Sequence, residues 1–80
     1  MLKRLLIVAR DYNRASHWAK EQRISPGFYV YVSSFHNIRG NAGSEYVLLD
    51  GWELRPDAAQ LQEELSAAGC KLRSTELPPN

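Results

Sequence analysis

The pattern of apolar and polar residues divides the chain into alternating strand and helix segments. A continuous aliphatic run at residues 4–9 (RLLIVA) is typical of a strand buried on both faces. Small and apolar residues at helical spacing follow at 12–23 and predict an amphipathic helix, with Asp11 or Asn13 as its N-cap. Ser25-Pro26-Gly27 is then expected to end this helix, because proline cannot continue the hydrogen-bond ladder.

Two further apolar segments predict strands in the middle of the chain. Residues 28–32 (FYVYV) are all aromatic or β-branched, and residues 46–50 (YVLLD) are mostly apolar. The connection between them contains the residues of a single capped turn, which begins at Ser34 and ends at Gly40. The middle of the chain therefore reads as strand, turn, strand.

The last part of the chain predicts a second long helix and an edge strand. Asp57 and Gln60 form a capping-box pattern directly after Pro56, which suits a helix entry. Gly69 is the expected residue just beyond the helix, and the polar stretch at 70–75 suits the edge of a sheet. The buried stripe of the helix is predicted to consist of Ala58, Leu61, Leu65 and Ala68.

This order of elements, β-α-β-β-α-β, predicts an α/β fold. The expected architecture is a small, mostly parallel sheet of about four strands covered by helices, a Rossmann-like half fold. Residues 1–77 form one domain in this interpretation, and residues 78–80 form a tail. Parallel strands bring their carboxyl ends to one rim, where ligands of such sheets bind.

Composition places the chain among small globular domains. It has 80 residues, of which 44% are hydrophobic and 24% charged, and this is too apolar for a disordered chain. Its single cysteine, Cys70, excludes an intramolecular disulfide and favours a reducing compartment. The longest apolar run is far shorter than the roughly 20 residues that span a bilayer. We therefore expect a cytoplasmic domain that does not bind a membrane.

Charge is distributed unevenly along the sequence. Residues 1–40 hold seven basic and two acidic residues, a net charge of +5, whereas residues 41–80 hold three basic and seven acidic residues, a net charge of −4. Such asymmetry marks either a surface for nucleic acid or an acidic protein, or two helices with different solvated faces.

The motifs of common enzymes are missing from the sequence. The glycine-rich stretch at 39–43 precedes a strand and lacks the G-K-[ST] ending of a phosphate-binding loop. Cys70, His17 and His36 have neither zinc-ligand spacing nor the arrangement of a nucleophile and its base. We therefore expect no catalysis, no metal and no cofactor.

Carboxylates near the strand ends are the one arrangement that suggests a metal. Asp11, Asp50 and Glu53 all follow predicted strands and would suit Mg²⁺ if they met at the rim. The alternative is that Asp11 caps a helix and Asp50 belongs to a turn.

Cationic and aromatic residues are the better candidates for recognition. Such side chains stack on bases, contact phosphates and dominate protein interfaces. Trp18 and Trp52 have core packing as their alternative role. The candidate binding residues are Arg10, Arg14, Trp18, Arg39 and Trp52.

The segment from Arg10 or Arg14 through Trp52 resembles small α/β proteins encoded by actinobacterial bacteriophages. The shared features are an R-x-x-x-A-x-x-W-A helix, a Y-V-S strand end, an R-G loop and a hydrophobic strand. This resemblance implies phage origin and expression in the host cytoplasm. A weaker likeness links Ile38-Arg39-Gly40 and residues 46–50 to terminase and helicase ATPase cores, although the chain has no Walker A motif and has Gly51 where those cores have glutamate.

These observations together predict a small non-catalytic binding module. The expected role is that of a phage protein that contacts a host or phage protein, in its most specific form inhibiting the host. Self-association through the edge strand near Leu72 or through exposed aromatic residues is a further expectation. The alternatives are nucleic-acid binding by the basic N-terminal half, and a nucleotide- or Mg²⁺-binding remnant that uses Asp11, Asp50 and Glu53.

Overall fold

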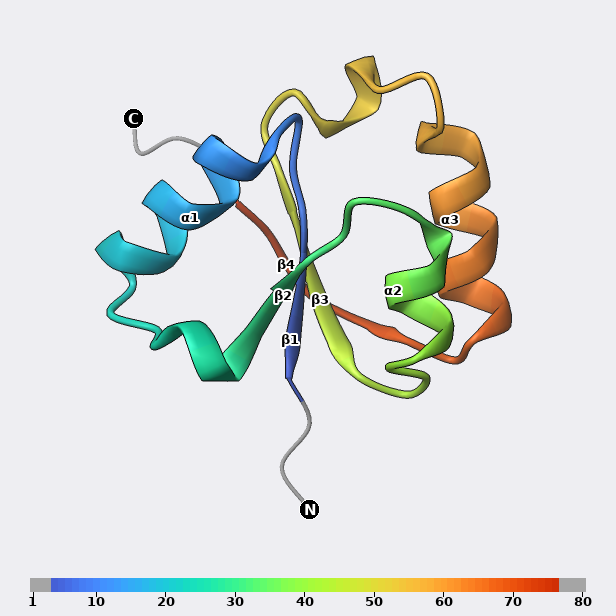
Figure 1. Cartoon of the computed structure of the whole chain (residues 1–80). Helices are drawn as coiled ribbons and strands as arrows, with labels where there is room; N and C mark the ends of the chain where they lie inside the picture. Colours follow the sequence, from blue (N-terminus) through green and yellow to red (C-terminus); the bar gives the residue numbers. More distant parts are fainter. Residues whose placement is uncertain (1–3, 77–80) are drawn as a thin grey trace.

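The computed structural model describes residues 4–76 and contains one parallel β-sheet (Figure 1). Its strands lie in the order β2-β1-β3-β4, and every neighbouring pair is parallel. The strands are β1 (Leu5–Val8), β2 (Tyr29–Tyr31), β3 (Glu45–Leu49) and β4 (Lys71–Glu76). The predicted α/β fold with a parallel sheet of four strands is thus confirmed. Residues 78–80, predicted to form a tail, lie outside the described residues.

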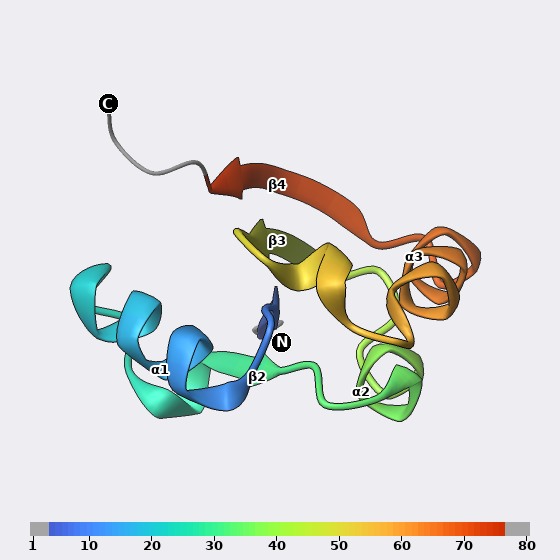
Figure 2. The ribbon, with the colours of Figure 1, turned by 90° about the horizontal axis from the view of Figure 1, so that it is seen from above.

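Helices cover both faces of the sheet (Figures 1 and 2). Helix α1 (Tyr12–Glu21) lies on one face, and α2 (Phe35–Arg39) and α3 (Ala58–Ala67) lie on the other. Two short 3₁₀ turns, η1 (Pro26–Phe28) and η2 (Trp52–Leu54), precede β2 and α3. Because the connections after β1 and β3 leave toward opposite faces, the strand order reverses between these two strands.

The central strand β1 explains the continuous aliphatic run. Leu5 and Ile7 pack on the side of α1, and Leu6 and Val8 pack on the side of α2 and α3, so every residue of the strand is buried. On the first side the cluster also contains the small residues Ala15 and Ala19 of α1. On the second side it also contains Val32, Ile38, Leu61 and Leu65.

Local side chains fix where α1 and α2 begin. The Arg14 amide donates to the Asp11 carboxylate at 2.9 Å, which confirms the predicted cap. At α2 the Ser34 hydroxyl accepts from the His36 amide, and the Asn37 side chain accepts from the Ser34 amide, which completes a capping box. The predicted capped turn is therefore a five-residue helix.

Both longer helices end in the same hydrogen-bond pattern. The Ile24 amide donates to the Ala19 carbonyl at 2.9 Å around Arg23, which has a φ of 58°. Gly69, with a φ of 71°, has the equivalent position after α3 and confirms the predicted end of that helix. The expectation that Ser25-Pro26-Gly27 ends α1 is wrong. The helix ends at Glu21, and the left-handed Arg23 changes the chain direction before Ser25 is reached.

Helix α3 begins after Asp57 as predicted, but the predicted capping box and the start of one predicted strand are wrong. The Asp57 side chain makes no capping hydrogen bond at α3, because its carboxylate is paired with Arg55. Phe28 belongs to η1 rather than to a strand and is largely exposed.

Candidate functional site

The carboxyl ends of the parallel strands form the end of the sheet where a ligand site is expected. In open parallel sheets, ligands bind where neighbouring connections leave toward opposite faces. Here that point lies between β1 and β3, at the upper end of the sheet in Figure 1.

An arginine side chain occupies much of this end. The Arg55 guanidinium donates to the main-chain carbonyls of Ala9 at 3.2 Å, Val32 at 2.6 Å and Ser33 at 3.0 Å. Its remaining two N–H groups donate to the Asp57 carboxylate, each at 3.0 Å. All five donors of the guanidinium are therefore satisfied inside the protein, and the side chain is only 9% exposed.

The gap between the β1 and β3 connections is also narrow. Gly51, with a φ of 90°, lies against the side chain of Arg10: a Cβ built on this glycine would be 3.5 Å from the Arg10 Cβ atom. The two connections that diverge at the switch point therefore leave little more room there than one added methyl group would fill.

This end presents apolar, cationic and acidic side chains to solvent, the acidic ones being Asp11, Asp50 and Glu53. Tyr12 is 58% exposed and Leu54 is 66% exposed. The Tyr12 and Tyr31 rings make a T-shaped contact with their centroids 5.8 Å apart. The centre of the Tyr31 ring in turn lies 5.7 Å from the Arg55 guanidinium. We define the carboxyl-end surface by exposed or half-buried residues in the connections after β1 and β3 and in the first turn of α1: Arg10, Tyr12, Arg14, Trp52 and Leu54.

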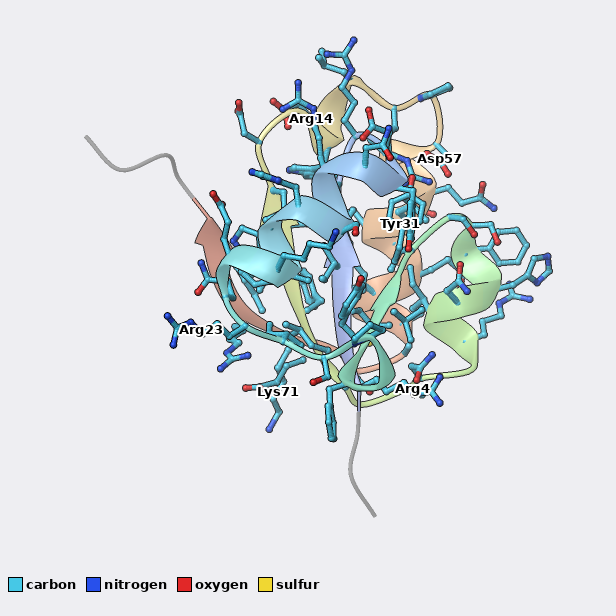
Figure 3. All side chains as sticks on the ribbon, turned by 60° about the vertical axis from the view of Figure 1, so that its left-hand side comes forward. Arg4, Arg14, Arg23, Tyr31, Asp57 and Lys71 are labelled. Atoms are coloured by element: carbon cyan, nitrogen blue, oxygen red, sulfur yellow. The ribbon has the colours of Figure 1, made fainter. Side chains whose placement is uncertain are left out.

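The five candidate binding residues divide over different parts of the molecule. Arg10, Arg14 and Trp52 belong to the carboxyl-end surface, and Figure 3 shows Arg14 at that end. Trp18 packs against the cluster beneath α1, and its Nε1 is buried with no hydrogen-bond partner among residues 4–76. Trp52 packs against the cluster on the opposite face. The tryptophans thus have at least a partial core role.

Arg39, the remaining candidate, is engaged by its neighbours. Its guanidinium makes two hydrogen bonds to the Glu64 carboxylate, at 3.2 and 3.1 Å, and lies 4.6 Å from the centre of the Phe35 ring. The hydrogen bonds to Glu64 and the charge of that carboxylate raise the pKa of Arg39. This arginine links α2 to α3 across the surface.

The carboxylates proposed for Mg²⁺ do not form a site. Asp11 accepts from the main chain at the start of α1, and no group of three His, Cys, Asp or Glu residues within 4–76 could hold a metal ion. The hypothesis of a metal cluster of Asp11, Asp50 and Glu53 is therefore wrong, and the helix-cap interpretation of Asp11 is the correct one.

A second feature lies at the opposite, amino-terminal end of the sheet. A half-open pocket of about 370 Å³ forms there between the starts of β1, β3 and β4 and the segment after α1. Its apolar wall is made by Leu5, Ile24 and Phe28, and its charged groups are Arg4, Glu45 and Arg73. Gly43 completes the lining.

Sequence reasoning missed both Arg55 and this pocket. The only signal for Arg55 is its place in the connection after an apolar strand, the region where sheet ligands bind. The pocket residues come from separate strands, and no sequence spacing connects them.

The chain matches no protein-family model, and no curated protein or solved structure matches it. No helix within residues 4–76 is long and apolar enough to cross a bilayer.

Proposed function

We propose that this chain is a non-catalytic binding module that acts by contact with another protein through the carboxyl-end surface. The observation that carries the proposal is the internal saturation of Arg55. Its guanidinium is bonded to three main-chain carbonyls and Asp57 at the end of the sheet where small ligands of such folds bind. A protein side chain therefore occupies space that a small ligand would need.

The composition of the remaining surface supports a protein partner. Tyrosine, tryptophan and arginine are the residues that most often dominate the binding energy of protein interfaces. Tyr12 and Leu54 offer exposed apolar area, and Arg10 and Arg14 add positive charge beside it. Asp50 and Glu53 are also exposed in the connection after β3, so a partner with an apolar centre and charges of both signs fits this combination.

The resemblance to actinobacteriophage proteins directs the proposal to a protein of the bacterial host. Contact with such a factor needs no catalytic group on the phage side. Inhibition would follow if the contact covers a surface that the host factor uses.

Affinity capture with matched variants tests this proposal. The tagged full chain is compared with a double variant, Arg14→Glu and Leu54→Glu, in capture from an actinobacterial lysate. Leu72→Glu is the control, because Leu72 is an exposed leucine on β4, 49% accessible and away from this surface. We expect a host protein that is retained by the wild-type chain and by the control but lost with the double variant.

The captured protein is then purified and titrated against all three chains. A Kd that rises at least about tenfold for the double variant, and less than about twofold for the control, supports the proposal. If the double variant, shown by circular dichroism to be folded, retains every protein that the wild-type chain retains, the proposal is wrong.

A further inference from the structure

The pocket at the amino-terminal end combines two kinds of surface. Its charged part comes from Arg4, which precedes β1, and from Glu45 and Arg73, which lie on β3 and β4. Its apolar part comes from β1 and from the segment between α1 and β2. A volume of about 370 Å³ is within the range of small-molecule sites.

The two arginines of the pocket are available to a ligand. The side chains of Arg4 and Arg73 make no hydrogen bond or ion pair with other residues in the described part of the chain. This distinguishes them from Arg39 and Arg55, which are bonded to carboxylates. A free guanidinium presents paired N–H groups that match the oxygens of a phosphate.

An irregularity in β4 accompanies one of these arginines. Leu72 pairs with Tyr46 and Ser74 pairs with Val47, so Arg73 has no partner residue on β3. Such a bulge turns a side chain away from the direction that regular pairing would give it. Arg73 lines the pocket from this position.

Further positive charge lies at the same end of the molecule. Figure 3 shows Arg23 and Lys71 at the lower end, with Arg4, and opposite Arg14 and Asp57. Neither Arg23 nor Lys71 has an ion-pair partner among residues 4–76. Among the described residues that line the pocket, Glu45 is the one acidic residue.

The apolar wall offers an aromatic ring beside these cations. Phe28 is 54% exposed although it lies next to the half-buried Ile24 and the buried Leu5 in the pocket. An exposed phenylalanine beside free arginines provides a face for a flat ring whose attached phosphate contacts the guanidinium groups.

We infer that this pocket binds a nucleotide unit, a flat base carrying a phosphate, either as a free nucleotide or as part of a single nucleic-acid strand. Phe28 stacks with the base, and Arg4 and Arg73 contact the phosphate. Arg23 and Lys71 extend the positively charged surface along which a nucleic-acid strand would continue. Glu45 opposes the phosphate and limits the affinity.

Fluorescence anisotropy with a labelled oligothymidylate of about eight nucleotides tests this site. We expect binding at low ionic strength, with an affinity that falls linearly on log–log axes as salt increases. Arg4→Ala and Arg73→Ala should each reduce the steepness of that line by about 0.7, the value for one phosphate contact on a single strand. Glu45→Gln should strengthen binding at every salt concentration.

The base-stacking role is tested separately from charge. Phe28→Ala should weaken binding at least about fivefold without changing the salt slope, and Phe28→Tyr should retain the wild-type affinity. Arg39→Ala is the matched control, because it removes an exposed arginine from α2, on the face of the sheet opposite α1, that does not line the pocket. Of the substituted residues, only Glu45 pairs with a residue of a neighbouring strand, so the other substitutions leave the described strand pairing unchanged. Circular dichroism checks that each variant is folded.

Competition identifies the form of the ligand. Displacement of the labelled strand by thymidine monophosphate indicates a free nucleotide as ligand, and displacement only by an unlabelled strand indicates single-stranded nucleic acid. The inference is overturned if no binding occurs at low ionic strength, if polyglutamate competes as well as the labelled nucleic-acid strand, or if Arg39→Ala weakens binding as much as Arg73→Ala. None of these outcomes bears on the carboxyl-end surface, so this inference and the proposed function fail independently.

Discussion

Arg55 joins three segments at the carboxyl end of the sheet. Its hydrogen bonds reach the residues that follow β1 and β2, and its ion pair reaches the start of α3. A buried guanidinium is stable only when its donors are satisfied, and here each of them is. The side chain therefore acts as an internal ligand that fixes this edge.

We expect Arg55→Lys to destabilise the protein by about 2–4 kcal/mol. A lysine ammonium has three donors and no planar fork, so it cannot replace contacts to three carbonyls and a bidentate carboxylate. Carbonyls and a carboxylate left partly unsatisfied in a buried site account for the cost. The measurement is urea unfolding followed by circular dichroism.

Arg39→Lys is the matched control for this substitution. Arg39 also makes a bidentate contact with a carboxylate, but its side chain is largely exposed and water can replace the lost hydrogen bonds. The urea-unfolding midpoint of Arg39→Lys should stay close to that of the wild-type chain. Equal shifts for the two variants would contradict the structural role assigned to Arg55.

At the scale of elements, the ends of α1 and α3 form a natural comparison. Both have the same hydrogen-bond motif, but the left-handed position holds Arg23 after α1 and Gly69 after α3. A side chain in this conformation is strained, whereas glycine is not. We therefore expect Arg23→Gly to stabilise the protein by about 0.5–1 kcal/mol.

Replacing the glycine at the equivalent position after α3 should have the opposite effect on stability. A Cβ at Gly69 would meet no atom within 4 Å, so Gly69→Ala isolates the backbone cost, about 1 kcal/mol of destabilisation. Thermal unfolding of both variants measures the pair. A stabilising Gly69→Ala would show that the left-handed conformation carries no cost here.

Local signals predicted most of the elements correctly. Asp11 and Ser34 cap their helices with atoms only a few residues away, so the sequence contains the whole interaction. Asp57 has the same kind of signal but a different role, because Arg55 competes for its carboxylate and the helix amides are left without it. This competition depends on the position of Arg55, which is fixed by carbonyls that are distant in the sequence. A local sequence pattern therefore cannot predict it.

Residues of the candidate sites could be predicted only where they directly follow a strand, because the end of the strand then determines their position. Arg10 and Trp52 follow apolar strands, and the rule for parallel sheets placed them at one rim. The pocket at the other end depends on β3 lying between β1 and β4, and on a bulge at Arg73. Neither the strand order nor the bulge has a signal in the sequence.

At the scale of the whole molecule, β1 is shared by two hydrophobic clusters on opposite faces. One face is covered by α1, with Trp18 packed against the cluster there, and the other is covered by α2 and α3, with Trp52 packed against the cluster. A domain of this size is expected to be stable by only about 4–12 kcal/mol. Neither cluster is large enough to be stable alone, so the two should unfold together.

The two tryptophans allow this cooperativity to be tested, since each reports on one face. In the single-tryptophan variants Trp18→Phe and Trp52→Phe, we expect fluorescence and circular dichroism to give one coincident urea transition. Ile7→Val, on the α1 side, and Ile38→Val, on the other side, should each cost about 0.5–1.5 kcal/mol. Because β1 transmits the loss to both clusters, either valine should shift the transition of both tryptophans equally. If Ile7→Val shifted the Trp18 signal and left the Trp52 signal unchanged, the two faces would be separate folding units and β1 would not couple them.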